Sequence, residues 1–506
     1  MAMKQNFEMV AKTFCGLEDV LAEELRNLGA ENVEPGLRMV SFEGGLEMLY
    51  KANLCCRTAL RILKPICKFI ARDTDSLYEM IKEINWSEIL TLDKTFAIDS
   101  VVYSDEFTNS RFVTYRAKDA IVDWFKDRFG PDKRPGVRQN GADVLINVHI
   151  AGDRVTVSLD SSGESLHKRG YRVAQTEAPI NEVLAAGIIL KTGWRGDAPL
   201  IDPMCGSGTF LVEAALIAAN IMPGVYRRNF AFEQWKGFDS ELFDRLYNDD
   251  SGEREVTHPI LGADISPKAV EIARRNLKSA GVARYVTLDT KPFQQWESVP
   301  AGGVMVMNPP YGERISAPDM EGLYSLIGSK LKHVFQGYHA WIIGYKEEYF
   351  RKIGLAPSLK VPMMNGPLEC ELREYVIFDG ELATFKREGG KLKEGPRRIA
   401  DKKKRRLSDS EWKAEARAKG FGGKEGPRTA KEPREPRNNI ERVYRPVKGR
   451  FGRRDRDERE ERSELPENPL AGRRNPGALK NLVNKRPSLP APEEKVFMRE
   501  RRGWRK

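Results

Sequence analysis

The sequence is poor in the side chains that hold metal ions. Its 506 residues include only six cysteines and five histidines, and no two cysteines form a C-x-x-C pair. Structural zinc sites are built on close pairs of Cys or His ligands, and that spacing is missing here. The sequence therefore predicts no metal site, and we expect the cysteines to be reduced thiols.

Two further absences narrow the class of protein. No apolar run approaches the ~18–20 residues that a helix needs to span a bilayer, and the N-terminal segment lacks the apolar core of a signal peptide. We therefore expect a cytoplasmic protein with no membrane partner. The G-x-x-x-x-G-K-[ST] pattern is also missing, which disfavours a triphosphate site.

Positive charge is concentrated at one end of the chain. The net charge is +11, but residues 382–506 carry 39 Lys and Arg against 20 Asp and Glu, which leaves 45 against 53 before them. Apolar residues become sparse in this last part, so it cannot bury enough surface to offset the entropy cost of ordering. The composition predicts a disordered basic tail over residues 381–506 behind an acidic body.

The most informative stretch of sequence is Pro199–Asn220. A short apolar run ends at Asp202, a loop with Gly206 and Gly208 follows, and the next apolar residues recur at helical spacing. Glycines let a ligand lie against the backbone, and free amides at a helix start favour a carboxylate or phosphate. Taken alone, the same pattern also fits a tight structural turn.

Three later stretches repeat the pattern of a strand that ends in a polar residue. Residues 259–266 reach Asp264, residues 286–293 contain Asp289, and residues 302–314 run into Asn308. In a doubly wound sheet the carboxyl ends of parallel strands share one rim, where ligands bind. The sequence therefore predicts an α/β sheet that brings these residues to one edge.

The first half of the chain is predicted to form α/β units that are smaller than the sheet of the second half. Residues 1–46 alternate strand, helix and strands, and residues 47–160 continue with alternating helices and strands. Residues 161–198 join this half to the glycine loop. We interpret residues 221–258 as an insertion, and we assign it no chemistry.

Together these motifs resemble the class I S-adenosylmethionine-dependent methyltransferases, and specifically the large-subunit ribosomal RNA guanine-N(2) methyltransferases of the RlmL type. The resemblance rests on DPMCGSGT, GADISPKAVEIARRN and NPPYGER, and on an N-terminal region that looks like a THUMP module. It implies a Rossmann-like domain with a mixed seven-stranded sheet at 199–380, behind an α+β region with a ferredoxin-like module at 1–46 and an RNA-binding THUMP domain at 47–160. Residues 161–198 would form a linker and a helix that closes over the cofactor.

The resemblance also implies an S-adenosylmethionine site. Its expected residues are Asp202, Pro203, Gly206, Ser207, Gly208 and Thr209 for the methionine part, Asp264 for the ribose hydroxyls and Asp289 near the adenine amine. An acid after the second strand binds a ribose diol in dinucleotide folds for the same physical reason. For Asp264 a plain helix-capping role is the alternative.

The run from Asn308 to Tyr311 suits a planar exocyclic amine. The side-chain oxygen of Asn308 and the carbonyl of Pro309 can accept both amine hydrogens, which aims the nitrogen lone pair at the methyl group. The Pro309-Pro310 pair is rigid and has no N–H to compete. Tyr311 can then stack on the base. A turn without chemistry is the alternative.

The motif does not name the amine, because adenine nitrogen-6 enzymes and glutamine methyltransferases share it. The resemblance implies guanine, in 23S ribosomal RNA or a large-subunit assembly intermediate. A transfer RNA guanine-N(2) methyltransferase and a non-catalytic RNA-binding assembly factor are the alternatives. A basic tail stands where some relatives carry a second methyltransferase domain, so we expect that second activity to be absent.

Six cations are candidate RNA contacts. They fall in two stretches, with an aromatic residue interleaved in the second: Arg111, Arg116 and Lys118, then His167, Arg169 and Arg172. Cations alternating with aromatics suit a nucleic-acid strand. A solvated helix face and a packed linker are the respective alternatives.

Overall fold

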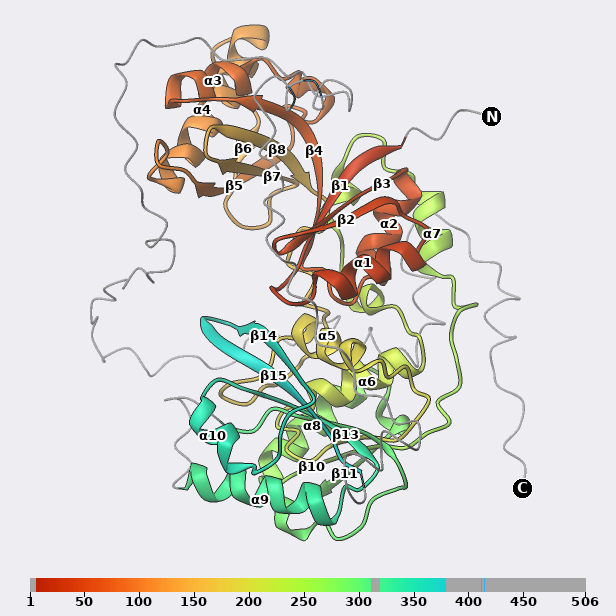
Figure 1. Ribbon diagram of the computed structural model, residues 1–506. Helices are drawn as coiled ribbons and strands as arrows, with labels where there is room; N and C mark the ends of the chain where they lie inside the picture. The colour runs from red at the N-terminus through yellow and green to blue at the C-terminus, as the bar shows by residue number, and fades with distance from the viewer. Residues whose placement is uncertain (1–5, 311–318, 379–410, 412–413, 415–506) are drawn as a thin grey trace, which may run out of the picture.

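A computed structural model describes residues 6–310 and 319–378, together with Glu411 and Ala414. Tyr311 and nearly all of the predicted tail lie outside these described residues. The described part forms two β-sheets with helices packed against them (Figure 1).

The first sheet has eight strands in the order β2-β3-β1-β4-β8-β7-β5-β6. In chain order, its strands and helices are β1 (Phe7–Lys12), α1 (Glu18–Asn27), β2 (Glu31–Gly36), β3 (Met39–Gly44), α2 (Leu46–Cys55), β4 (Arg61–Ile70), α3 (Thr74–Lys82), β5 (Thr95–Tyr103), α4 (Ser110–Phe129), β6 (Gly136–Val137), β7 (Val144–Ala151) and β8 (Arg154–Asp160).

Strand β4 joins the two parts of this sheet. It is ten residues long, and Leu63 pairs with Val10 of β1 on one side and with Asp160 of β8 on the other. A strand of this length can serve two sets of neighbours, whereas most strands have about five or six residues. The domain boundary predicted at residue 46 therefore divides the chain between strands that belong to one continuous sheet.

The second sheet has seven strands in the order β11-β10-β9-β12-β13-β15-β14. Its elements, with the preceding helix, are α5 (Glu182–Thr192), β9 (Leu200–Asp202), α6 (Thr209–Ala218), α7 (Ser240–Tyr247), β10 (Ile260–Asp264), α8 (Pro267–Ser279), β11 (Val286–Thr290), β12 (Gly303–Met307), α9 (Met320–His333), β13 (Tyr338–Gly344), α10 (Glu347–Lys352), β14 (Leu359–Asn365) and β15 (Leu368–Val376).

Five strands of the second sheet run parallel, and the β15–β14 hairpin is antiparallel. This confirms the predicted mixed seven-stranded sheet. The chain passes from β9 outward through β10 to β11 and then returns to β12 on the other side of β9. Such a reversal opens a crevice at the carboxyl ends of the central strands.

The two halves share a hydrophobic core. Leu17, the N-cap residue of α1, is fully buried in the same cluster as residues of α5 and α6. A Cβ atom at Gly187 of α5 would lie 2.4 Å from a Leu17 methyl carbon, so the missing side chain makes room for Leu17. Lys191 and Asp19 add an ion pair at 2.8 Å. Figure 1 shows α1 directly above α5 at this contact.

The insertion at 221–258 packs on the N-terminal module. Phe230, Phe232 and Phe243 are buried in one core cluster, and the Phe232 ring stacks on Tyr50 with centroids 4.6 Å apart. These aromatics are core residues. None of the described helices is long and apolar enough to cross a membrane.

Candidate active site

The glycine loop connects β9 to α6 at the rim of the second sheet. Gly206 and Gly208 have φ angles of 51° and 77°, in the left-handed region that glycine adopts without strain. A Cβ atom at Gly208 would lie 2.9 Å from the Cβ of Ala273 in α8. The loop therefore needs glycine at this position both for its backbone angle and for its close packing.

Two acids, Asp202 and Asp264, lie next to the glycine loop, and their surroundings differ. Asp202 is 1% exposed, and burial together with the nearby Asp264 carboxylate raises its pKa well above the usual range. Asp264 accepts hydrogen bonds from the backbone N–H groups of Gly206 and Ser266, each at 2.9 Å. A carboxylate can accept about four hydrogen bonds, so both oxygens of Asp264 keep capacity for a diol.

The capping alternative for Asp264 does not describe helix α8. Ser266 is the N-cap residue, and its hydroxyl accepts a hydrogen bond from the Ala269 amide at 3.3 Å. Asp264 lies two residues earlier and supports the turn and the glycine loop. The carboxylate is therefore held at the ligand-binding rim.

A cavity of about 2290 Å³ opens over this rim. Ligand pockets are typically ~300–1,000 Å³, so the cavity has room for a second group beside one cofactor. Its wall combines the loop residues Asp202 to Ser207 and Thr209, Asp264 to Ser266, Asn308 to Pro310, the segment 175–182, the hairpin residues 365–368 and Phe14. Phe14 precedes α1, so the N-terminal half contributes to the wall.

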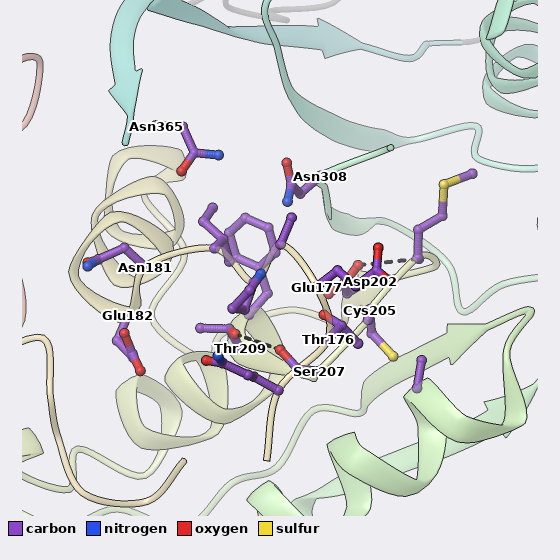
Figure 2. Close-up of a pocket in the computed structure, with 18 of the residues that line it drawn as sticks. Thr176, Glu177, Asn181, Glu182, Asp202, Cys205, Ser207, Thr209, Asn308 and Asn365 are labelled. Carbon is purple, nitrogen blue, oxygen red and sulfur yellow. Dashed lines mark hydrogen bonds between the residues drawn. The ribbon is translucent and has the colours of Figure 1, made fainter. Parts of the chain in front are cut away.

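Asn308 begins the segment that follows β12, and it faces this cavity. Its side-chain oxygen Oδ1 is buried and has no hydrogen-bond partner among the described residues. A buried acceptor without a partner costs free energy, which a ligand N–H would recover. Figure 2 shows Asn308 across the pocket from Ser207 and Thr209. Pro309 and Pro310 line the same cavity, and Tyr311 lies outside the described residues.

Two apolar wall residues were missed in the sequence. Ile265 is 70% exposed although it is apolar, and it lines the cavity directly after Asp264. Phe293 lines it after β11. Apolar walls are the usual surface for a flat ring. The sequence signal that could have identified Ile265 is its position directly after Asp264.

Asp289 is the predicted cofactor residue that the structure places least clearly. It is in β11, paired in register with Ala263, but it is absent from the cavity wall. Its carboxylate lies 3.1 Å from the ammonium of Lys291. The predicted contact with adenine stays a prediction.

Arg172, predicted to contact RNA, holds the glycine loop through hydrogen bonds and lines the cavity, and its RNA contact stays a prediction. Its guanidinium pairs with Glu182 at 2.6 Å and donates to the hydroxyls of Ser207 at 3.2 Å and Thr209 at 3.0 Å. A further bond at 3.1 Å reaches the carbonyl of Ile180. Arg172 therefore connects the linker and the start of α5 to the loop.

Arg169 is buried and bonds within the protein, and its predicted RNA contact stays a prediction. Its side chain is 2% exposed, lies 3.6 Å from Glu213 of α6, and donates to the carbonyls of Leu166 and Arg57. Tyr171, also buried, donates to Glu213 at 2.9 Å. Burial raises the pKa of Glu213 although Arg169 opposes the shift. This cluster joins the N-terminal half to α6.

The remaining predicted RNA contacts are more accessible. His167 lines the cavity. On α4, Arg111 is exposed, Arg116 pairs with Asp75 at 2.7 Å, and Lys118 pairs with Asp119 at 2.5 Å. Surface ion pairs of this kind contribute little and can be exchanged for phosphates. RNA contact by these residues stays a prediction.

Three family models match successive stretches of the chain. An RlmL ferredoxin-like domain matches residues 8–63, a THUMP domain matches 71–160, and an RMKL-like methyltransferase domain matches 169–374. Their order agrees with the order of the two sheets. The first two matches meet near β4, the strand that both parts of the first sheet share.

Two curated relatives match most of the described residues. A ribosomal RNA large subunit methyltransferase K/L from Syntrophotalea carbinolica is 39% identical over 378 residues, covering 72% of this chain and 53% of the relative. A Synechocystis protein, provisionally named an RNA methyltransferase, is 37% identical over 366 residues, covering 72% and 95%. The chain thus spans about half the length of the K/L relative.

Two solved structures share the fold over most of this chain. SMU.472, described as a candidate methyltransferase and crystallised with SAH, is 33% identical with a TM-score of 0.67, covering 75% of this chain and 100% of that one. A candidate methylase from Clostridium difficile 630 is 32% identical with a TM-score of 0.69, covering 74% and 100%.

The strand order, the glycine loop and the polar rim define a class I methyltransferase fold attached to a ferredoxin-like and THUMP region. The Synechocystis relative is matched along nearly its whole length. This chain belongs to the RMKL-like methyltransferase family.

Proposed function

We propose that this protein transfers a methyl group from S-adenosylmethionine to the exocyclic N2 amine of a guanine in 23S ribosomal RNA. The observation that carries the proposal is the buried Oδ1 of Asn308, which has no hydrogen-bond partner within residues 6–310 and 319–378 and shares one cavity with the glycine loop and Asp264. An acceptor for an amine hydrogen thus lies beside a site for an activated donor.

The residues around the glycine loop fit S-adenosylmethionine. Gly206 leaves open space where a side chain would stand, with only the Thr176 hydroxyl oxygen within 4 Å of a Cβ atom. The amides at the start of α6 favour a carboxylate, and Asp264 can accept hydrogen bonds from ribose hydroxyls. Ile265 offers an exposed apolar face for adenine. When bound, this cofactor supplies an electrophilic methyl group on a sulfonium.

Asn308 and the prolines prepare the nucleophile. The nitrogen lone pair of a guanine amine is delocalised into the ring. Asn308 Oδ1 and the Pro309 carbonyl accept hydrogen bonds from the two N–H groups of the amine. These bonds turn the nitrogen lone pair toward the methyl group. Pro310 lacks an N–H and holds the segment rigid. Because the methyl group is already activated, placing the two atoms in line does most of the catalytic work.

The choice of RNA rests on the comparisons. The THUMP match and the name of the K/L relative support ribosomal RNA of the large subunit, whether free or in an assembly intermediate. We therefore place the protein in the cytoplasm, where bacterial ribosomes are assembled. A transfer RNA guanine is the second candidate, because the amine-binding motif does not distinguish the two RNAs.

The deciding experiment offers labelled S-adenosylmethionine with protein-free 23S RNA, 16S RNA and transfer RNA, followed by nucleoside analysis. We expect N(2)-methylguanosine in 23S RNA only. The same nucleoside in transfer RNA would support the second candidate. Calorimetry with S-adenosylmethionine provides the control for catalytic competence, because a non-catalytic assembly factor would show no binding.

A further inference from the structure

The hairpin of β14 and β15 ends in a stiff two-residue turn. Its register closes at the pair Asn365 and Leu368, with Gly366 and Pro367 between them. Gly366 has a φ angle of 61°, and proline restricts its own φ. Glycine in the first turn position is typical of tight hairpins. The backbone of the flanking residues Asn365 and Leu368 is therefore held in a fixed geometry.

This tip forms part of the wall of the active-site cavity. Asn365 and Leu368 line the cavity together with Asn308. Figure 2 shows the carboxamide groups of Asn365 and Asn308 turned toward one another. Leu368 is 36% exposed and adds an apolar surface to the wall at this tip.

The N-terminal half supports the hairpin. A Cβ atom at Gly16 would lie 2.7 Å from the carbonyl oxygen of Pro362 in β14 and 3.6 Å from Met363. Phe14, two residues earlier, lines the same cavity. Val361 and Met363 of β14 also share one buried cluster with Val306 of β12, two residues before Asn308, so the hairpin and the start of the Asn308 segment rest on the same core.

We propose that Asn365 selects guanine by reading its N1–H and O6. A carboxamide presents one acceptor and two donors, so its Oδ1 can accept from N1–H while its Nδ2 donates to O6. Asn308 holds the neighbouring N2 amine at the same time. Leu368 packs against the face of the base. This inference rests on the proposed function and adds base selectivity to it.

The test uses a base that keeps the target amine but lacks both groups that Asn365 reads. In 2-aminopurine the 2-amine is present, O6 is missing, and N1 carries no hydrogen. The 23S fragment that the wild-type protein methylates is assembled twice by ligation, with guanine or with 2-aminopurine at the target nucleotide. Methyl transfer to both fragments is measured as kcat/KM for wild type, Asn365→Ala and the isosteric Asn365→Asp.

We expect wild type to prefer guanine by roughly tenfold or more, as two neutral hydrogen bonds would give. Both variants should lose this preference through slower transfer to guanine, with transfer to 2-aminopurine unchanged. The matched control is Glu369→Gln, since Glu369 is exposed on the same hairpin and outside the cavity wall. It should keep the wild-type preference.

Three outcomes would overturn the inference. Equal loss of transfer to both fragments would make Asn365 a structural residue of the hairpin. If Asn365→Asp kept the wild-type preference for guanine over 2-aminopurine, the Nδ2 group would make no selective hydrogen bond to O6. Equal methylation of both fragments by the wild-type protein would show that the N1–H and O6 groups of guanine are not selected. A wild-type protein that methylates no guanine in any RNA would instead reject the proposed function.

Discussion

The carboxamide of Asn308 is the residue on which the proposed chemistry depends most directly. Asn308→Ala removes the acceptor for an amine hydrogen and leaves the glycine loop unchanged. We expect methyl transfer to fall by far more than tenfold while the affinity for S-adenosylmethionine stays within a few-fold. Single-turnover transfer and calorimetry measure the two quantities. Transfer within tenfold of wild type would remove Asn308 from the mechanism.

Asp264 supports both the loop and the proposed ribose contact. Asp264→Ala loses the hydrogen bond from Gly206 and those expected from ribose, each worth roughly 1.5–3 kcal/mol when the acceptor is charged. We expect cofactor affinity to fall at least tenfold. Calorimetry with S-adenosylmethionine measures it, and Asp264→Asn is the isosteric control, expected to lose less. Unchanged affinity in the alanine variant would restrict Asp264 to the turn.

Replacing Arg172 distinguishes support of the glycine loop from direct contact with RNA. Arg172→Gln removes the ion pair with Glu182 and weakens the hold on Ser207 and Thr209. We expect KM for S-adenosylmethionine to rise while RNA affinity stays unchanged. Arg172→Lys should restore part of the cofactor affinity, because it keeps the charge. The reverse result, weaker RNA binding with an unchanged KM, would return Arg172 to the predicted RNA surface.

At the scale of elements, the loop between β9 and α6 depends on glycine for two separable reasons. Gly208→Ala imposes a left-handed backbone angle on alanine, costing about 1–3 kcal/mol, and brings its Cβ against Ala273 of α8. Gly237 has a similar φ angle of 80°, with nothing within 4 Å of a Cβ atom. Gly237→Ala therefore isolates the backbone cost.

We expect Gly208→Ala to lower Tm more than Gly237→Ala and to abolish the rise in Tm that S-adenosylmethionine produces. Gly237→Ala should keep that rise. Thermal melts of both variants with and without the cofactor test this. Equal melting temperatures in the two variants would mean that the contact with α8 relaxes at little cost.

On the scale of the whole molecule, charge is divided between the body and residues 382–506. These residues carry 39 Lys and Arg against 20 Asp and Glu, and they lie almost wholly outside the described residues. A polyanion must reach an active site in a body with a net charge of −8, from 45 basic and 53 acidic residues. We propose that the basic segment supplies much of the attraction by counterion release.

Deleting residues 382–506 should leave cofactor binding intact, weaken RNA affinity and flatten its dependence on salt. Each neutralised single-strand phosphate contributes a slope of about −0.7 in a log–log plot. Binding of a ribosomal RNA fragment by the full and shortened proteins, compared across a salt series, measures the change. Parallel slopes would assign this segment another role, such as solubility or contact with a protein partner.

Local patterns in the sequence predict the α/β sheet and the polar residues at its edge. Asp202, Asp264 and Asn308 each stand at the end of a short apolar run, and a glycine loop follows the first of them. These signals are local, because strand ends and left-handed glycines depend on neighbouring residues. They predict an α/β sheet with polar residues at one edge, and the resemblance to the methyltransferase family implies seven mixed strands, which the structure confirms.

The contacts of several cavity residues depend on packing between segments that are far apart in the sequence. Arg169 and Arg172 belong to a basic stretch that looks like a nucleic-acid patch, yet their partners are Glu213 and Glu182. Asn365 belongs to an ordinary hairpin until the sheet brings its tip to the cavity. Composition cannot reveal these roles, because the partner of a charge or an amide is set by chain packing between segments far apart in sequence.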